Sequence, residues 1–233
     1  MQLTVRDVTR FFSVSESTVT RWIRQRGLPS QHVNGQYRFH RAELLEWATT
    51  NQIKFSLEML DDLETADEPP PSLAAALEAG GIFYNVQDTS KERALRALAQ
   101  VLPLPEGIDR ELILRLLLVR EAAATTAIGD GIALPHVRNP IVLHVDRPMI
   151  TLCFLERAVD FGALDGKPVQ FLFSLICPTT RNHLQMLSRL SYALQNPQFK
   201  AVIMRHGPRD EILAEARRID ASLVAGPAGK ASR

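Results

Sequence analysis

The sequence predicts an α/β fold in which helices flank a mixed sheet, preceded by a small helical domain that contains a hairpin. From about residue 73 onward, segments typical of strands alternate with segments typical of helices. Two of the strand segments, 150–155 and 169–176, are almost wholly apolar, as is usual for central strands covered on both faces. Residues 3–50 instead show two short helices, a hairpin and a third helix, and a chain of 233 residues has room for both units.

Charge is distributed unevenly along the chain, although the formal net charge is only +1. Residues 1–54 contain eight arginines and lysines against four acids, whereas residues 55–72 contain six acids and no base. The acidic stretch closes on a triple proline, which cannot continue a helix and stiffens the chain. We therefore expect a first domain at 1–54, a linker at 55–72, a second domain at 73–224 and a disordered tail at 225–233.

The composition favours a soluble cytoplasmic protein with no membrane segment. The N-terminus lacks the apolar run of a signal peptide. The strongest apolar run, 112–119, is interrupted by Arg115 and is far shorter than the roughly 20 residues of a membrane helix. Cys153 and Cys177 both lie in apolar runs, which is typical of small buried hydrophobes rather than of a disulfide or a metal pair.

Two helices joined by a short turn are predicted at the N-terminus. Thr4 and Asp7 have the spacing of a capping box, so a helix should begin at Thr4 and run to about Phe12. Ser15 should cap a second helix that ends near Gly27. This arrangement is a helix-turn-helix. One face of the second helix is apolar, whereas the other is polar and basic.

A basic hairpin and a closing helix follow. Asn34-Gly35 is a strong signal for a two-residue turn, and residues 41–50 predict a helix with an apolar face. Residues 3–50 resemble the excisionase and MerR-like winged helix-turn-helix group, through the strings TVTRWI (18–23), GLP (27–29) and NGQYRF (34–39). The resemblance implies DNA binding, with the second helix in the major groove and the hairpin as a wing. The residues expected at the DNA are Ser17, Thr18, Thr20, Arg21, Arg24, Gln36 and Arg38.

The DNA-binding interpretation has an alternative, in which the arginines form a solvated face and the domain binds a protein. One module of this size makes few DNA contacts, so useful affinity calls for a homodimer or a second protein. Leucines and a methionine at near-helical spacing within 51–67 leave open a connecting helix that pairs two chains, or an unstable linker helix.

The second domain shows the alternating pattern in detail. Strands are expected near 82–86, 132–134, 142–145, 150–155 and 169–176. Helices are expected near 90–102, 110–122, 182–195 and 210–221. Asp165-Gly166 should form the turn between the last two strands.

The most informative segment is IGDGIALPH, residues 128–136. Its two glycines permit a tight turn, and a short apolar strand follows. Pro135 restricts its own backbone and that of its predecessor, so His136 is held in a defined direction. A rigidly placed imidazole suits reversible chemistry at one ring nitrogen.

This segment closely resembles the active site of the type-2 enzyme IIA domains of the bacterial phosphotransferase system, the fructose, mannitol and nitrogen-regulatory group. The resemblance covers about 77–223 and agrees with the predicted α/β fold. It implies that His136 accepts a phosphoryl group, that Arg120 contacts that group and that His183 is a second active-site histidine. Asp130 and Gly131 would support the site.

The chemistry of these three side chains fits that role, because phosphoryl transfer needs positioning and charge neutralisation more than covalent help. An arginine can hold phosphoryl oxygens bidentately, and a neutral imidazole offers the attacking lone pair.

Two features depart from the family. Val137 stands where a glycine is frequent, and some sugar-specific relatives carry glutamate at the position of Asp130. A divalent metal held by Asp130, His136 and His183 is an alternative. That spacing matches no known metal signature, so we expect no metal and no cofactor.

Together these features predict a DNA-binding regulator that receives a phosphoryl group on His136 from an HPr-type phosphocarrier, with a consequent change in DNA or partner binding. Its second domain would be a phosphoryl acceptor rather than an enzyme that turns over a small molecule. Two alternatives stay open: an enzyme IIA component that passes the phosphoryl group to a separate enzyme IIB, and a IIA-like module that is never phosphorylated and only binds proteins. The basic N-terminal domain favours the regulator, because a mere tether needs no basic helix and wing.

Overall fold

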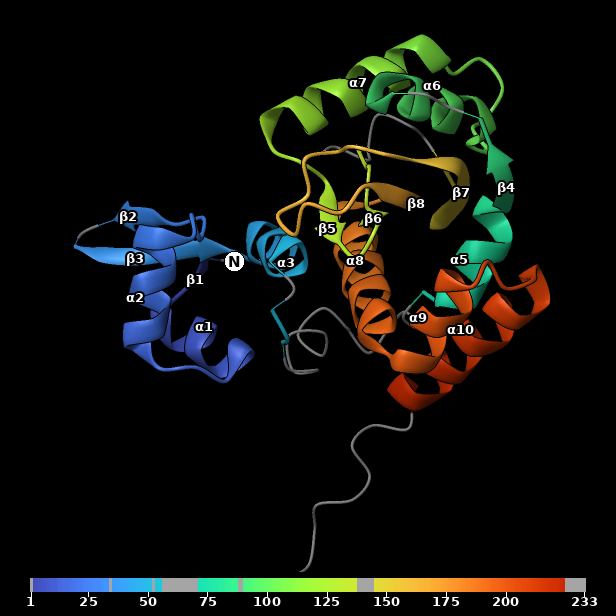
Figure 1. Cartoon of the computed structure of the whole chain (residues 1–233). Coiled ribbons are helices and arrows are strands. Elements are labelled where there is room, and N and C mark those ends of the chain that lie inside the picture. The colour runs from blue at the N-terminus through green and yellow to red at the C-terminus, as the bar shows by residue number, and fades with distance from the viewer. Residues whose placement is uncertain are drawn as a thin grey trace, which may run out of the picture.

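The helices and strands of the chain form two groups in the computed structural model (Figure 1). It describes residues 2–33, 35–51, 53–55, 71–87, 90–137 and 145–224. The N-terminal group consists of β1 (Gln2–Leu3), α1 (Val5–Phe12), α2 (Glu16–Gln25), β2 (Gln31–Val33), β3 (Gln36–His40) and α3 (Arg41–Thr50). Its strands form an antiparallel sheet in the order β1-β3-β2.

The capping signals in the N-terminal group act as predicted. The Thr4 hydroxyl accepts from the backbone N–H of Asp7, and the Asp7 carboxylate accepts from the backbone N–H of Thr4, which completes a capping box. Ser15 caps α2 by accepting from the backbone N–H of Thr18. Trp47 of α3 packs against Trp22 of α2 with ring centroids 5.2 Å apart. The indole N–H of Trp47 also donates to the backbone at the end of α2, so α3 closes the core of this group.

The C-terminal group is a five-stranded sheet with helices on both faces. Its first elements are α5 (Leu73–Gly80), β4 (Ile82–Val86), α6 (Lys91–Val101), α7 (Arg110–Ala123), β5 (Ala127–Gly129) and β6 (Ile132–Ala133). The remaining elements are β7 (Met149–Val159), β8 (Val169–Ile176), α8 (Thr180–Gln195), α9 (Pro197–Met204) and α10 (Arg209–Val224). Among these residues, no helix is long and apolar enough to cross a membrane.

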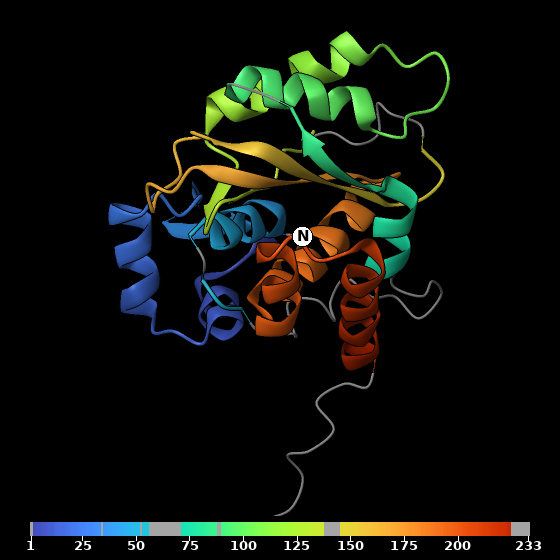
Figure 2. The same ribbon diagram turned by 45° about the vertical axis from the view of Figure 1, so that its right-hand side comes forward.

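The sheet is mixed, as predicted. Its strand order is β4-β7-β8-β6-β5, with β4 parallel to β7, β6 parallel to β8, and the other two pairs antiparallel. Along β7 the side chains alternate between two cores. Leu152 and Phe154 pack in the core that includes α8, whereas Cys153 and Leu155 pack in the core that includes α6 and α7. Figure 2 shows α6 and α7 on one side of the sheet and α8, α9 and α10 on the other. The central strands β7 and β8 are therefore covered on both faces.

The structure differs from the expected elements in several places. The sequence did not indicate α5 or α9, although Ser72 caps the first and Asn196 caps the second. The strand expected at 150–155 extends over 149–159. Of the strand expected at 142–145, only Val145 is described, and it is not in a strand. The segment 51–67, for which a connecting helix and an unstable linker helix were both left open, lies almost wholly outside the described residues, and the tail at 225–233 lies outside them entirely.

Helix α3 joins the two groups. It contacts α8 and β5, and it lies between the N-terminal elements and α8 in Figure 1. Thr49 of α3 and Ser191 of α8 are both buried, and their hydroxyl oxygens are 2.7 Å apart. The apolar side chains of α3 and those of α8 belong to one continuous core. The contact between the groups is thus an apolar surface with a hydrogen-bonded hydroxyl pair inside it.

Candidate functional site

A tight turn positions the strand that leads to His136. Three consecutive residues, Gly129, Asp130 and Gly131, adopt positive φ angles of 89°, 52° and 73°, and the chain reverses there between β5 and β6. Glycine tolerates this conformation because it lacks a Cβ atom. The backbone oxygen of Gly131 accepts from the N–H groups of Gln170 and Phe171, which fixes the turn to the start of β8. The tight turn expected from the two glycines is present.

A hydrogen bond to the backbone two residues earlier holds the imidazole of His136. Its Nδ1 atom lies 2.8 Å from the backbone oxygen of Leu134. A carbonyl oxygen can only accept, so this hydrogen bond requires the proton on Nδ1. In the neutral ring the lone pair then lies on Nε2, which is the atom able to attack an electrophile. The local backbone therefore selects both the orientation and the tautomer of the imidazole.

Two further predicted side chains lie beside His136. The ring of His183, in the first turn of α8, has its centroid 5.1 Å from that of His136. Arg120, in the last turn of α7, lines the same small cavity as His136 and donates to the backbone oxygen of Ala124 at 2.9 Å. Thr179 caps the helix that carries His183, so His183 follows directly on a helix N-terminus, which favours anions. The structure thus brings together Arg120 from α7, His183 from α8 and His136 from the segment after β6.

The site is almost closed to solvent. The exposed fractions are 3% for His136, 5% for His183 and 8% for Arg120. The cavity that His136 and Arg120 share has a volume of about 10 Å³. Thr49 of helix α3 lines this cavity too, so the N-terminal group forms part of its wall. Neither the burial nor the role of Thr49 was expected from the sequence.

The side chain of Asp130 binds two lysine side chains. Its carboxylate accepts from Lys167 Nζ at 2.7 Å and from Lys200 Nζ at 2.5 Å. These two hydrogen bonds, that of Lys167 first, lower the pKa of Asp130 to about 2. Its backbone N–H donates to Asp165, and this hydrogen bond lowers the pKa of that carboxyl. The observed contacts of Asp130 thus brace the turn before the strand, and no sequence signal pointed to the two lysines.

The metal alternative finds no support in the geometry. Within the part of the chain that the structure describes, no three histidine, cysteine, aspartate or glutamate side chains are grouped so as to hold a metal ion. Cys153 and Cys177 are both buried and are not bonded to each other. Burial raises the pKa of each thiol to about 12, so both are inert at neutral pH.

The predicted DNA-contacting residues lie on α2 and on the β2–β3 hairpin. Arg21 and Arg24 are exposed on α2, whereas the Thr20 hydroxyl donates to the backbone of its own helix. On the hairpin, Arg38 donates to the side chain of Gln36 at 2.7 Å. The remaining predicted residues, Ser17 and Thr18, are exposed and partly exposed. The two arginines are therefore the side chains of α2 best placed to reach a ligand.

Comparison with known proteins places these two groups in known families. Residues 76–217 match the family described as "Phosphoenolpyruvate-dependent sugar phosphotransferase system, EIIA 2". The chain belongs to this EIIA type-2 family. Residues 3–52 match a family described as "Helix-turn-helix domain". The EIIA type-2 resemblance and the helix-turn-helix expected from the sequence are both confirmed.

Individual relatives agree with the EIIA type-2 assignment. A "Nitrogen regulatory protein" of Pseudomonas aeruginosa is 36% identical over 152 residues, which cover 60% of this chain and 91% of that protein. A "PTS system fructose-specific EIIA component" of Haloferax volcanii is 33% identical and covers 46% of this chain and 71% of that protein. Among solved structures, the nitrogen regulatory protein IIA-Ntr of Neisseria meningitidis superposes with a TM-score of 0.54 at 25% identity. That match covers 62% of this chain and 98% of the Neisseria chain.

Proposed function

We propose that this chain is a DNA-binding regulator whose EIIA type-2 domain accepts a phosphoryl group on His136 from an HPr-type phosphocarrier. The observation that carries the proposal is the meeting of His136, His183 and Arg120 in one buried site, on a chain that also contains a helix-turn-helix. The nitrogen regulatory proteins among its relatives support a regulatory rather than a transport role.

The proposed transfer follows from the atoms of the site. The lone pair on Nε2 of His136 attacks the phosphorus of the donor's phosphohistidine, and a new P–N bond forms. The bond between phosphorus and the donor nitrogen breaks, and its electron pair returns to the donor ring. The proton on Nδ1 of His136 stays in place and donates a hydrogen bond to the backbone oxygen of Leu134 throughout. Arg120 and the N–H groups at the start of α8 would offset the charge on the phosphoryl oxygens.

The N-terminal domain would read DNA in the manner of the excisionase and MerR-like winged group. In this proposal α2 enters the major groove with Arg21 and Arg24, and the β2–β3 hairpin acts as the wing with Gln36 and Arg38. Domain limits at 1–54 and 73–224, separated by the acidic linker, remain part of the proposal. So does a homodimer, because a single small module makes few contacts to DNA.

The proposal is tested with a phosphorylated HPr-type carrier and intact-protein mass. Wild type should gain one phosphate, and His136→Ala should gain none. His32→Ala is the matched control for phosphate uptake, because His32 is exposed on β2 and lies outside the site, and it should gain one phosphate as wild type does. Affinity for a random-sequence DNA duplex is then compared before and after phosphorylation, with an expected change of about five-fold or more. Absence of phosphate uptake with an active donor and folded protein would refute the acceptor role.

A second candidate function is an EIIA component that passes phosphate to a separate enzyme IIB. The match to a fructose-specific EIIA component favours it. It predicts that phosphorylated protein loses its phosphate to an enzyme IIB domain within minutes, and that DNA affinity does not respond to phosphorylation.

A further inference from the structure

Helix α3 of the helix-turn-helix lies where the EIIA site would have to open. Thr49, in its last turn, lines the cavity that also contains His136 and Arg120. Thr49 is anchored from both sides, because its hydroxyl donates to the backbone oxygen of Leu45 at 2.7 Å and lies 2.7 Å from the hydroxyl of Ser191. One hydroxyl carries one proton, so Ser191 is the donor in the second contact. These two hydrogen bonds fix the geometry of the contact between Thr49 and Ser191.

The space beside His136 and Arg120 is too small for a phosphoryl group while α3 is docked. A volume of about 10 Å³ is roughly what a single water molecule needs. A phosphoryl group adds four heavy atoms to His136, and its oxygens need partners as well as space. His136 is only 3% exposed while α3 is docked, so a phosphocarrier has no path to Nε2. Because Thr49 forms part of the wall of this space, we expect a phosphoryl group on His136 to displace docked α3.

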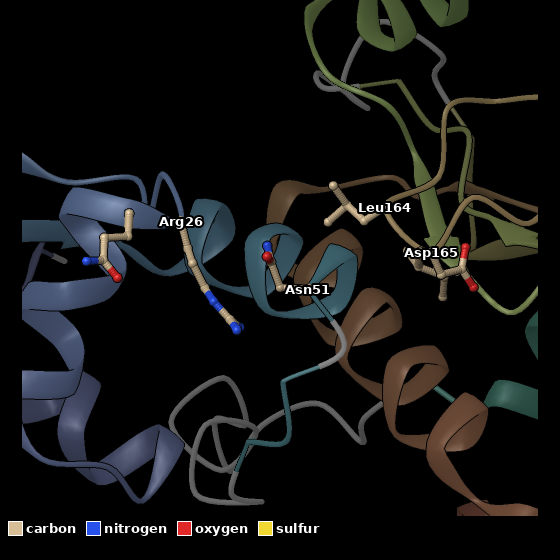
Figure 3. A pocket seen from close by; sticks show the side chains of 7 residues that line it. Arg26, Asn51, Leu164 and Asp165 are labelled. Atoms are coloured by element: carbon tan, nitrogen blue, oxygen red, sulfur yellow. The ribbon is translucent and has the colours of Figure 1, made fainter.

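The periphery of the contact between α3 and the EIIA domain is where the two domains would begin to separate. Two cavities flank it, of about 620 Å³ and 220 Å³. Figure 3 shows the larger one, with Arg26 and Asn51 of the N-terminal domain on one side and Leu164 and Asp165, from the turn between β7 and β8, on the other. Both cavities are open to solvent, so water already reaches the rim of the contact between the domains.

We propose that α3 is a reversible lid, and that the EIIA surface around His136 is a docking surface for the chain's own helix-turn-helix domain. This inference rests on the proposed phosphoryl-acceptor function and adds its regulation. A phosphocarrier gains access to His136 only when α3 leaves, and the phosphoryl group then keeps α3 away. By thermodynamic reciprocity, whatever holds the helix-turn-helix away from the EIIA surface, bound DNA included, favours phosphorylation.

The test locks the lid with an engineered disulfide between Thr49→Cys and Ser191→Cys. The two hydroxyl oxygens, which the sulfur atoms would replace, are 2.7 Å apart, so a small shift of the side chains would bring the sulfurs to the S–S bond length of about 2.0 Å. Cys153 and Cys177 are buried and do not compete for the new thiols. Oxidised protein should accept phosphate from the phosphocarrier at least ten-fold more slowly than the same protein after reduction. Thr49→Cys alone, taken through the same steps, should show no difference.

A second readout works without phosphorylation. Diethyl pyrocarbonate modifies accessible imidazoles, and peptide mass reports each histidine separately. The locked form should show at least ten-fold slower modification of His136 than the reduced form, whereas exposed His32 should react equally in both. Equal modification of His136 in the two forms would overturn the lid. A difference in modification with no phosphate uptake in either form supports the lid and refutes the acceptor function.

A third variant covers the case in which the disulfide does not form. Thr49→Arg places a long cation against Arg120 and should displace α3. With circular dichroism unchanged from wild type, faster modification of His136 supports the lid, and an unchanged rate overturns it.

Discussion

Replacing Asp130 by asparagine removes the negative charge that two lysines share beside the turn before His136. Hydrogen bonds from Lys167 and Lys200 lower the pKa of Asp130 from 3.8 to about 2. A shift of that size corresponds to about 2.4 kcal/mol of folding free energy. Both lysine side chains are partly exposed, and solvent screens their attraction to Asp130. The loss of folding free energy in Asp130→Asn should therefore be about 1 kcal/mol.

The lowered pKa of Asp130 determines how this loss of folding free energy changes with pH. The folded-state pKa of Asp130 is the lower one, so its contribution is fully present above the unfolded value of 3.8 and is lost as the pH falls through about 2. At pH 3 about half of the contribution remains. Urea unfolding of wild type and Asp130→Asn, followed by circular dichroism at pH 7 and pH 3, measures both values.

Glu156→Gln is the matched control, because it removes one negative charge from an exposed position on β7. Its stability should stay within about 0.5 kcal/mol of wild type at both pH values. Equal stability of Asp130→Asn and wild type at pH 7, or a gap that widens toward acid, would show that the two lysines do not hold Asp130 as described.

Three other predictions concern packing, thiol chemistry and DNA. A Cβ atom on Gly80 would lie 2.1 Å from a backbone oxygen of β7, so Gly80→Ala should cost about 3 kcal/mol in thermal or urea unfolding, and a loss below 1 kcal/mol would contradict the observed packing. Cys153 and Cys177 should resist a thiol reagent at pH 8 in the native protein and react at once in denaturant, because burial raises the pKa of both to about 12. Arg21→Ala and Arg24→Ala should each weaken DNA binding and lower the slope of log affinity against log salt by about 1, and unchanged slopes would argue for a protein ligand.

Local signals explain how much of this fold the sequence predicts. The capping box at Thr4 and Asp7, the Ser15 cap and the two glycines before His136 act within a few residues, and the structure has each where it was expected. The near-continuous apolar strands likewise identify the centre of the sheet, because only a strand covered on both faces tolerates them. The family resemblance adds that His136, His183 and Arg120 meet, which no spacing alone would indicate.

The contacts that the sequence did not predict join distant positions. Thr49 and Ser191 are 142 positions apart, and both are ordinary small polar residues with no pattern that links them. Lys200 reaches Asp130 across 70 positions. Such contacts arise when whole domains and helices pack, so the closed state of the His136 site could only be found in the structure.

The most direct test of the central claim is to locate the phosphate after incubation with a phosphorylated HPr-type carrier. Peptide mass spectrometry in alkaline buffer preserves phosphohistidine and assigns it to a residue. The account predicts one phosphate on the peptide that contains His136, none on other histidine peptides, and none in His136→Ala. A phosphate on His183 instead, or no phosphate on wild type from a donor that phosphorylates another EIIA protein, would contradict it.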